Sequence, residues 1–185
     1  FVTKMPKQFP YPVTVSFGQP LPTQTPLWKT RQAIQELGQV AWQQRQAQRK
    51  PLHQTWIRSI RRRPFRMAFG EQAKPGVSGI KALAGAITLG KLLRAHLTNQ
   101  NRVGVLLPPS IAGATVNIAL SIAGRTSVNL NYTAGKEGMR SAVEQAKLRT
   151  VITSRTFLEK AKLELPKATV PLYLEDLVKQ IRPRL

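Results

Sequence analysis

Four arginines lie close together in the sequence, at Arg61, Arg62, Arg63 and Arg66, and Phe65 stands between them. Guanidinium groups bind phosphate and other anions, and an aromatic side chain among them adds an apolar anchor. The stretch is therefore a candidate anionic-surface patch, because binding to acidic lipids uses these two kinds of side chain. A nucleic acid would also satisfy the charge, although no known reading module surrounds the arginines. A third interpretation is a solvated helix end, where cations interact favourably with the helix dipole.

A second pattern has the spacing of a phosphate-binding loop. Gly85, Gly90 and Lys91 match the first seven positions of G-x-x-x-x-G-K-[ST], but Leu92 occupies the position that needs Ser or Thr to reach magnesium. The pattern also falls inside a predicted helix, where backbone N–H groups are not free to bind phosphate. We therefore expect no phosphate site at these residues.

Other catalytic and metal-binding residue types are scarce. The chain has no cysteine, and its two histidines, His53 and His96, are far apart in the sequence. Disulfides, thiolate nucleophiles and cysteine metal sites are excluded, and a zinc site or a Ser-His triad has almost no residues to be built from. We identify no catalytic, cofactor-binding or metal-binding residue in the sequence.

The longest uncharged run in the chain predicts the central elements of the fold. Residues 103–107 are almost wholly apolar, which is typical of a strand covered on both faces. Two prolines end this strand, Ser110 is suited to cap a helix, and apolar residues then recur at helical spacing up to residue 122. Residues 126–130 again have strand-like composition. The order strand, helix, strand predicts a crossover unit of a parallel sheet.

The same run allows another interpretation. The 22 residues between Arg102 and Arg125 carry no charge, and about 20 apolar residues suffice to cross a bilayer. The adjacent prolines, the polar residues in the run and an apolar stripe on one side only argue against a membrane span. We expect the crossover unit rather than a transmembrane helix.

Asn131 and Tyr132 follow the second strand of this unit. Ligands of open α/β sheets gather at the carboxyl ends of the strands, so these two residues are a candidate pocket-edge loop. The alternative is a structural role, since polar loop residues commonly stabilise turns.

The remaining sequence alternates between helical and strand-like periodicity. We predict strands at 11–17, 65–69, 150–152 and 170–174, a turn at 70–76, and helices at 27–50, 51–63, 78–97, 135–147, 155–162 and 175–182. The predicted inner faces are Leu83, Ile87 and Leu93 in one helix, and Met139, Ala142, Val143 and Ala146 in another. From residue 103 onward this order predicts an α/β fold, a partial open and mainly parallel sheet flanked by helices.

The net charge is +21 in 185 residues, and the excess is largest over residues 28–74, which carry +9. Such a charge favours a polyanionic partner, either nucleic acid or an anionic membrane surface. A basic proteome, or an acidic remainder of the protein elsewhere, would explain it equally well, because net charge informs on association and not on fold. With 42% hydrophobic residues, the chain is long enough for one core.

The order of segments resembles the N-terminal subdomain of AMP-forming acyl-adenylating enzymes, the acyl-CoA and acyl-carrier-protein synthetases. The resemblance covers residues 51–185 and is carried by WIRSIRRRPFRMAF, KALAGAITLGKLL, RVGVLLPPSIAGATVNIALSIAGRTSVNLNYT and RTVITSRTFLEK. It implies the N-terminal part of an AMP-binding domain. The family's Ser/Thr/Gly-rich phosphate loop, adenine-binding segment, ribose-binding aspartate and C-terminal lysine have no counterpart in these residues, so we expect the chain alone to be inactive.

Residues 1–27 contain PKQFPYPVTVSFGQPLP, which is similar to the last strand of glycerophospholipid acyltransferase domains, without their H-x-x-x-x-D pair. This strand would be left from another domain, and residues 28–50 would be a basic helical linker. Both parts occur together, acyltransferase first, in the bifunctional acyl-carrier-protein synthetase and 2-acylglycerophosphoethanolamine acyltransferase proteins. The segments that resemble that group most are VLLPPS, NLNYT, TSRTFLEK and LYLEDL.

The resemblance implies an activity for the whole protein: activation of a fatty acid with ATP and magnesium, transfer to an acyl carrier protein, and acylation of a lysophospholipid. It also implies a peripheral or membrane-associated location on the cytoplasmic face of the inner membrane. No signal peptide is recognisable in the first residues, where Lys4, Pro6, Lys7 and Pro10 interrupt the apolar sequence. A nucleic-acid-binding module and a membrane-surface adaptor, the latter using residues 56–66, stay open as alternatives.

Overall fold

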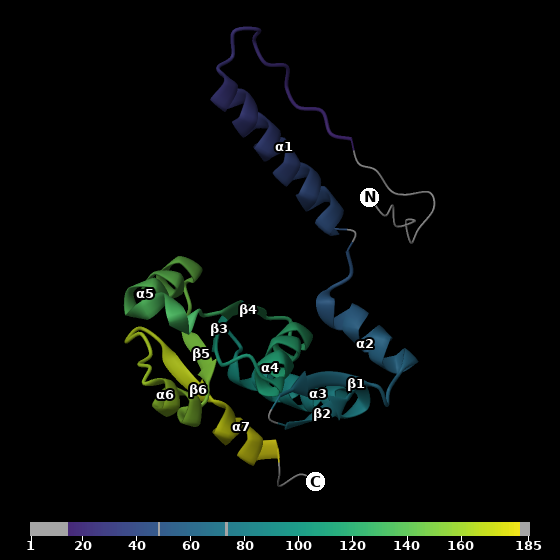
Figure 1. Ribbon diagram of the computed structural model, residues 1–185, viewed down its shortest axis with the longest axis vertical. Helices are drawn as coiled ribbons and strands as arrows, with labels where there is room; N and C mark the ends of the chain where they lie inside the picture. Colours follow the sequence, from purple (N-terminus) through teal and green to yellow (C-terminus); the bar gives the residue numbers. More distant parts are fainter. Residues whose placement is uncertain (1–14, 48, 73, 182–185) are drawn as a thin grey trace. The chain divides into compact units, whose positions relative to one another are not determined.

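The computed structural model describes residues 15–47, 49–72 and 74–181. The chain divides into two compact units, Phe1–Lys50 and Pro51–Leu185 (Figure 1). The division falls between the predicted helical linker, residues 28–50, and the segment predicted to be the N-terminal part of an AMP-binding domain. The identity of these segments stays a prediction.

The described part of the first unit consists of an irregular segment and one helix, α1 (Leu27–Ala47), which confirms the predicted helix. The strand predicted at 11–17 is wrong over residues 15–17, which form no strand, and its first four residues lie outside the described part of the chain. A strand requires a neighbour to satisfy its backbone groups. The described residues of this unit include no other strand with which it would pair.

The second unit is built on a sheet of four parallel strands in the order β4-β3-β5-β6. The strands are β3 (Arg102–Leu106), β4 (Thr126–Asn129), β5 (Thr150–Thr153) and β6 (Val170–Tyr173). β3 and β5 are the two central strands, and Gly104 pairs with Val151 between them. The predicted α/β fold with an open, mainly parallel sheet is confirmed.

Helices cover both faces of this sheet (Figure 1). One face packs against α3 (Gly79–His96), α4 (Ile111–Ile122) and α7 (Leu174–Ile181), in a cluster that includes Val105 and Ile152. The other face packs against α5 (Gly135–Ala146) and α6 (Arg155–Ala161), in a cluster that includes Leu106 and Val151. Neighbouring residues of a strand point to opposite faces, so the same strands contribute to both clusters. From α3 to α7 the helices and strands end within one residue of the predicted bounds.

The uncharged run forms β3, α4 and β4, as predicted. Ser110 begins α4, and its Oγ accepts a hydrogen bond from the Gly113 N–H at 3.1 Å. Gly124 follows the helix with a φ of 73°, a left-handed conformation that glycine adopts without strain. The alternative of a membrane span is wrong for this run, and in the part of the chain that is described no helix is long and apolar enough to cross a bilayer.

The inner face of α5 is confirmed, whereas that of α3 is wrong in part. Met139 and Val143 are buried, but in α3 Leu83 is only half-buried and Ile87 is exposed. The buried side chains of α3 are Ala82, Ala86, Leu89 and Leu93. Small residues bring α3 close to α4, since a Cβ added at Gly90 would lie 3.0 Å from the Ala119 carbonyl oxygen. The close helix contact, rather than residue size, therefore decides which face is buried.

A helix and a hairpin precede α3. The helix α2 (Leu52–Arg62) is confirmed and ends before Pro64. β1 (Met67–Glu71) is shifted by two residues from the predicted strand, and β2 (Lys74–Ser78) pairs with it. The turn predicted over 70–76 is confirmed at Gln72, between the two strands, and is wrong over residues 70–71 and 74–76, which are in strands. Proline and glycine in β2 disfavour a regular strand. A Cβ at Gly76 would overlap the Met67 side chain, which would have to move, and would lie 3.1 Å from the Phe69 carbonyl oxygen.

Gly104→Ala is expected to destabilise the second unit, because β3 and β5 approach closely at this position. A Cβ would lie 2.9 Å from Val151 Cγ2 and 3.2 Å from Leu148 Cδ1, and both side chains are buried. Overpacking of this kind costs about 1–3 kcal/mol. Urea unfolding followed by circular dichroism will measure the loss.

Gly85→Ala is the matched control for this substitution. A Cβ at Gly85 of α3 meets no atom within 4 Å, and alanine favours helix over glycine by about 1 kcal/mol. The control is therefore expected to gain stability. A similar loss in both variants would contradict the close approach at Gly104.

Candidate functional site

A cavity of about 450 Å³ opens at the carboxyl ends of β3 and β4, beside the start of α4. Most of its wall is apolar and consists of Val105, Leu107, Pro108, Pro109, Ala114 and Leu130. Carboxyl ends of parallel strands are where open α/β sheets bind ligands. The cavity is therefore the candidate functional site of the second unit.

The sequence after β3 produces this cavity. Pro108 and Pro109 cannot continue the strand ladder, so the chain leaves the sheet and α4 starts at once behind Ser110. Gly113, in the first turn of α4, lies close to the preceding segment, since a Cβ there would be 3.0 Å from the Pro108 carbonyl oxygen. The prolines and this close approach fix one wall of the cavity.

Two asparagines form a polar bridge in the cavity wall. Asn117 of α4 and Asn129 of β4 each donate a side-chain hydrogen bond to the other, both at 3.1 Å. Asn117 Nδ2 also donates to the Gly113 carbonyl at 2.9 Å. The sequence analysis missed this pair, because its only signal is two polar residues in an apolar run, and their contact depends on how α4 packs beside β4.

The predicted pocket-edge residues, Asn131 and Tyr132, both line this cavity. Asn131 Oδ1 accepts hydrogen bonds from the Thr133 N–H at 3.0 Å and from Thr133 Oγ1 at 2.8 Å, at the start of the short helix η1 (Tyr132–Ala134). The Tyr132 ring packs edge-on against Phe157, with centroids 5.3 Å apart. Both residues thus stabilise the loop, and a ligand-binding role for them stays a prediction.

A second polar cluster lies beyond β5 and β6 and joins the starts of α6 and α7. Ser154 Oγ donates to Glu175 Oε1 at 2.7 Å, and Arg155 donates to both carboxylate oxygens of Asp176 at 2.9 and 2.7 Å. Arg155 also lies 3.9 Å from the centre of the Tyr173 ring. The hydrogen bonds from Arg155 hold the pKa of Asp176 below its ordinary value.

The Glu175 carboxylate is subject to opposing effects. Burial raises its pKa. Hydrogen bonds from the Ser154 hydroxyl and from the backbone N–H groups of Glu175, Thr156 and Arg155 together lower the pKa by a larger amount, so the net shift is downward. The carboxylate is therefore held ionised at the point where α6 and α7 meet. We assign this cluster a structural role, because the Arg155–Asp176 pair and the Ser154–Glu175 hydrogen bond each join α6 to α7.

The anionic-surface patch lies elsewhere on the second unit. Arg61 and Arg62 end α2, and Arg63 and Arg66 lie in the turn before β1; all four are exposed and none lines the cavity. The structure thus does not bring the two predicted sites together. The binding role of the four arginines stays a prediction.

The remaining sequence motifs are accounted for by the fold. Gly85 to Lys91 lie within α3, so the phosphate-loop pattern is part of a continuous helix, as expected. His53 Nδ1 is 2.9 Å from Ser121 Oγ, which links α2 to α4, and His96 Nε2 is 3.3 Å from Gln180 Oε1. Among the described residues no group of three His, Cys, Asp or Glu side chains is placed to hold a metal ion.

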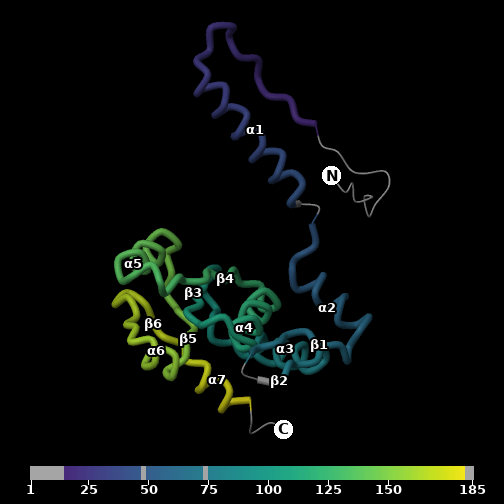
Figure 2. Tube along the Cα trace, in the orientation of Figure 1, coloured from purple at the N-terminus to yellow at the C-terminus, as the bar shows by residue number. Residues whose placement is uncertain are grey.

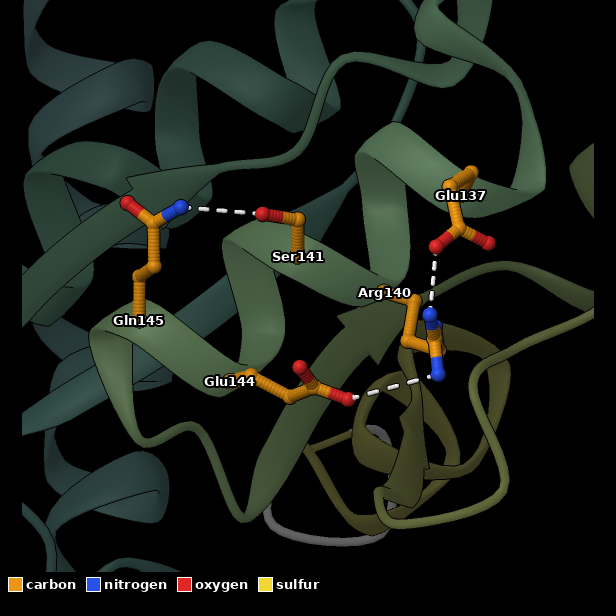
Figure 3. A network of polar contacts seen from close by, with 5 residues as sticks. All are labelled: Glu137, Arg140, Ser141, Glu144 and Gln145. Atoms are coloured by element: carbon orange, nitrogen blue, oxygen red, sulfur yellow. Dashed lines mark hydrogen bonds and ion pairs between the residues drawn. The ribbon is translucent and has the colours of Figure 1, made fainter.

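Most acidic side chains of the second unit are used in exposed pairs late in the chain. Figure 3 shows Arg140 of α5 between Glu137 and Glu144, with Gln145 donating to Ser141 at 2.9 Å. The hydrogen bond to Glu137 raises the pKa of Arg140. These pairs follow the helical spacings i, i+3 and i, i+4 and support the exposed side of α5.

The parallel sheet with its flanking helices matches the fold of the N-terminal subdomain of adenylate-forming enzymes. The chain is similar to that subdomain of NpsA from Klebsiella oxytoca, with a TM-score of 0.62 and 16% identity over 70% of this chain and 32% of that chain. It is also similar to NpsA-ThdA, an artificially fused adenylation–PCP di-domain from K. oxytoca, with a TM-score of 0.60 and 16% identity over 70% of this chain and 24% of that chain.

A third similar structure is O-succinylbenzoate coenzyme A synthetase from Bacillus subtilis, in complex with ATP and magnesium ion. Its TM-score is 0.58, with 17% identity over 67% of this chain and 26% of that chain. The chain thus spans less than a third of the length of each of these structures. No family model matches the chain.

Glu175→Gln is expected to lower the free energy of unfolding near neutral pH. The variant is also expected to lose less of its stability than the wild type as the pH falls. The folded-state pKa of Glu175 is depressed, so its contribution is present above about pH 4.3, the ordinary glutamate value, and is lost as the pH falls through the lower folded-state value. Urea midpoints measured across this range will show the wild-type and variant curves converging in acid. Glu159→Gln, an exposed position of α6, is the control, and parallel curves for Glu175→Gln would contradict the assignment.

Proposed function

We propose that the chain is the first part of the N-terminal subdomain of an adenylate-forming ligase. The observation that carries the proposal is the match of the parallel sheet and its helices to that subdomain, with a TM-score of 0.62 to the NpsA structure. The B. subtilis synthetase structure is a complex with ATP and magnesium ion, which supports these as the nucleotide and metal of the whole protein. The reaction would join a carboxylate oxygen to the α-phosphorus of ATP and release pyrophosphate.

The proposed acid substrate is a fatty acid. The resemblance of residues 51–185 to acyl-CoA and acyl-carrier-protein synthetases motivates this choice, and the largely apolar wall of the cavity supports it, since such a wall favours a hydrocarbon chain over a polar side chain. The proposed acceptor is an acyl carrier protein. A carrier partner in general is supported by NpsA-ThdA, an artificial fusion of an adenylation domain to a PCP.

The proposed fusion to a lysophospholipid acyltransferase rests on the sequence of residues 1–27. The described residues of that segment, 15–27, do not form the strand that the resemblance implies. The proposed acylation of a lysophospholipid at the cytoplasmic face of the inner membrane rests on the same segment.

In this proposal the described residues do not bind ATP or magnesium. They include no metal-binding group of acidic or histidine side chains, and the Gly85–Lys91 pattern has its backbone N–H groups inside α3. Their part in the proposed reaction is to form the sheet and one wall of the acyl site. The groups that bind nucleotide would come from other residues of the whole protein.

ATP–pyrophosphate exchange tests the proposed reaction. The protein extended by the gene sequence that follows Leu185 is expected to catalyse exchange only when a fatty acid is present, and the 185-residue chain alone is expected to catalyse none. Two results would contradict the proposal: exchange by the 185-residue chain alone, or a continuation without a Ser/Thr/Gly-rich loop within a few dozen residues.

Ala114→Phe tests whether the cavity holds the fatty acid. Ala114 lines the cavity from α4, so a phenyl group there would fill it and is expected to raise the KM for the fatty acid about tenfold or more, without changing the KM for ATP. Ala112→Phe, at an exposed position of the same helix outside the cavity, is expected to change neither value. Unchanged fatty-acid kinetics in Ala114→Phe, with normal circular dichroism, would exclude the cavity as the acyl site.

A further inference from the structure

A short turn joins α2 to β1 (Figure 2). It carries basic and apolar side chains that are exposed. Residues 61–67, with the sequence Arg-Arg-Arg-Pro-Phe-Arg-Met, are named the arginine turn, and all of them are exposed except Pro64, which is half-buried. Phe65 is 82% exposed and Met67 is 66% exposed. Two large apolar side chains held in water beside four guanidinium groups indicate a surface that binds a partner.

The backbone of the arginine turn is fixed to the core of the second unit. The Ile80 N–H donates to the Pro64 carbonyl at 2.8 Å, and the Gly79 N–H donates to the Arg66 carbonyl at 2.8 Å. The Arg63 N–H donates to the Ile60 carbonyl at 3.0 Å. These hydrogen bonds anchor the turn to α2 and to the start of α3, so its side chains are presented by a defined backbone.

The apolar face of α2 is used by the fold at Trp56 and Ile60, next to the arginine turn, and is exposed at Leu52, at the other end of the helix. Ile60 is buried, and a Cβ at Gly79 would lie 3.1 Å from Ile60 Cγ2, which places α2 directly on the start of α3. Trp56 stacks on Phe69 of β1, with ring centroids 5.8 Å apart. At the arginine turn, the groups left for a partner are therefore the arginines together with Phe65 and Met67.

The charge around the arginine turn has one sign. Residues 51–70 include five arginines and no acidic residue. Among the described residues, none of the guanidinium groups of Arg61, Arg62, Arg63 and Arg66 forms an ion pair. Three basic side chains later in the unit, Lys136, Arg140 and Arg155, do form ion pairs. A concentration of positive charge without internal partners attracts a polyanion.

We propose that the arginine turn docks on a membrane surface that contains anionic lipids. Guanidinium groups bind the lipid phosphates, while Phe65 and Met67 enter the boundary between headgroups and acyl chains, where apolar groups are removed from water. The seven residues thus combine basic side chains, which suit the lipid headgroups, with apolar side chains, which suit the acyl boundary. This inference rests on the turn alone and holds whether or not the chain belongs to a ligase.

The same residues fit a nucleic acid less well. Binding of single strands uses several aromatic side chains on which successive bases stack, along a groove that follows the backbone. The arginine turn offers one exposed ring, Phe65, and an exposed methionine, whose flexible side chain suits the acyl boundary. Phe65 and Met67 beside a basic cluster supply the two contributions that an interfacial contact combines, apolar burial and attraction to anionic lipids.

Sedimentation of the 185-residue chain with lipid vesicles tests the proposal. The chain is expected to bind vesicles of phosphatidylcholine with phosphatidylglycerol and to bind phosphatidylcholine vesicles weakly. The triple substitution Arg61→Glu, Arg62→Glu and Arg63→Glu is expected to lower the affinity for anionic vesicles roughly a hundredfold or more. Phe65→Ser, which leaves the charge unchanged, is expected to lower it about tenfold.

The control is a triple substitution with the same change in charge, Lys160→Glu, Lys167→Glu and Lys179→Glu. These lysines are exposed and lie far along the chain, on or near α6 and α7. The control is expected to bind vesicles several-fold more weakly at most, through loss of general charge alone. An equal loss in the two triple variants, or unchanged binding by Phe65→Ser, would overturn the proposal, because the arginine turn would then have no special part in binding.

A fluorescence measurement reports insertion directly, since the chain has no cysteine and accepts a single labelled one. Phe65→Cys carrying an environment-sensitive dye is expected to shift to the blue on anionic vesicles, whereas Ala168→Cys, an exposed position elsewhere in the unit, is expected not to shift. No shift at position 65 would overturn the proposal. Binding of single-stranded DNA that is abolished by the arginine substitutions, with vesicle binding unaffected by them, would identify a nucleic acid as the partner instead.

Discussion

A parallel sheet needs helices on both of its faces, because its strands carry apolar side chains on each side and no face is left for water. In the second unit β3 meets this requirement most completely: Val103 and Leu106 are fully buried in opposite clusters. α3, α4 and α7 on one side, and α5 and α6 on the other, hold β3 in place. Every feature of the candidate site depends on this double coverage.

The cavity lies at the start of α4, one of the helices that cover the sheet. β3 ends at two prolines, α4 turns back from Ser110, and β4 returns beside β3, so the carboxyl ends of the two strands leave a space that the backbone does not fill. The bridge between Asn117 and Asn129 and the turn at Asn131 satisfy the polar groups at this edge. The apolar remainder of the wall is the observation that supports the proposed hydrocarbon ligand.

Charge is distributed unevenly over the second unit. Carboxylates in the later part pair with Lys136, Arg140 and Arg155 or receive hydrogen bonds at the starts of helices, where they stabilise α5, α6 and α7. Residues 51–70 include no carboxylate side chain, and the four arginines of the turn face solvent. Part of the +21 charge of the whole chain is thus concentrated at one place, where the arginines lie beside exposed apolar side chains on a fixed turn.

The order and type of the elements from α3 to α7 could be predicted from the chain alone, because apolar runs, helical periodicity, the prolines after β3 and the cap at Ser110 are local properties of the sequence. The loop at Asn131 and Tyr132 could be located in the same way. Three features required the three-dimensional packing: the burial of Ala82 and Ala86 in place of Leu83 and Ile87, the pairing of β2 with β1, and the contact of Asn117 with Asn129. These features depend on distances between segments far apart in the sequence, and no local pattern records how closely two elements approach.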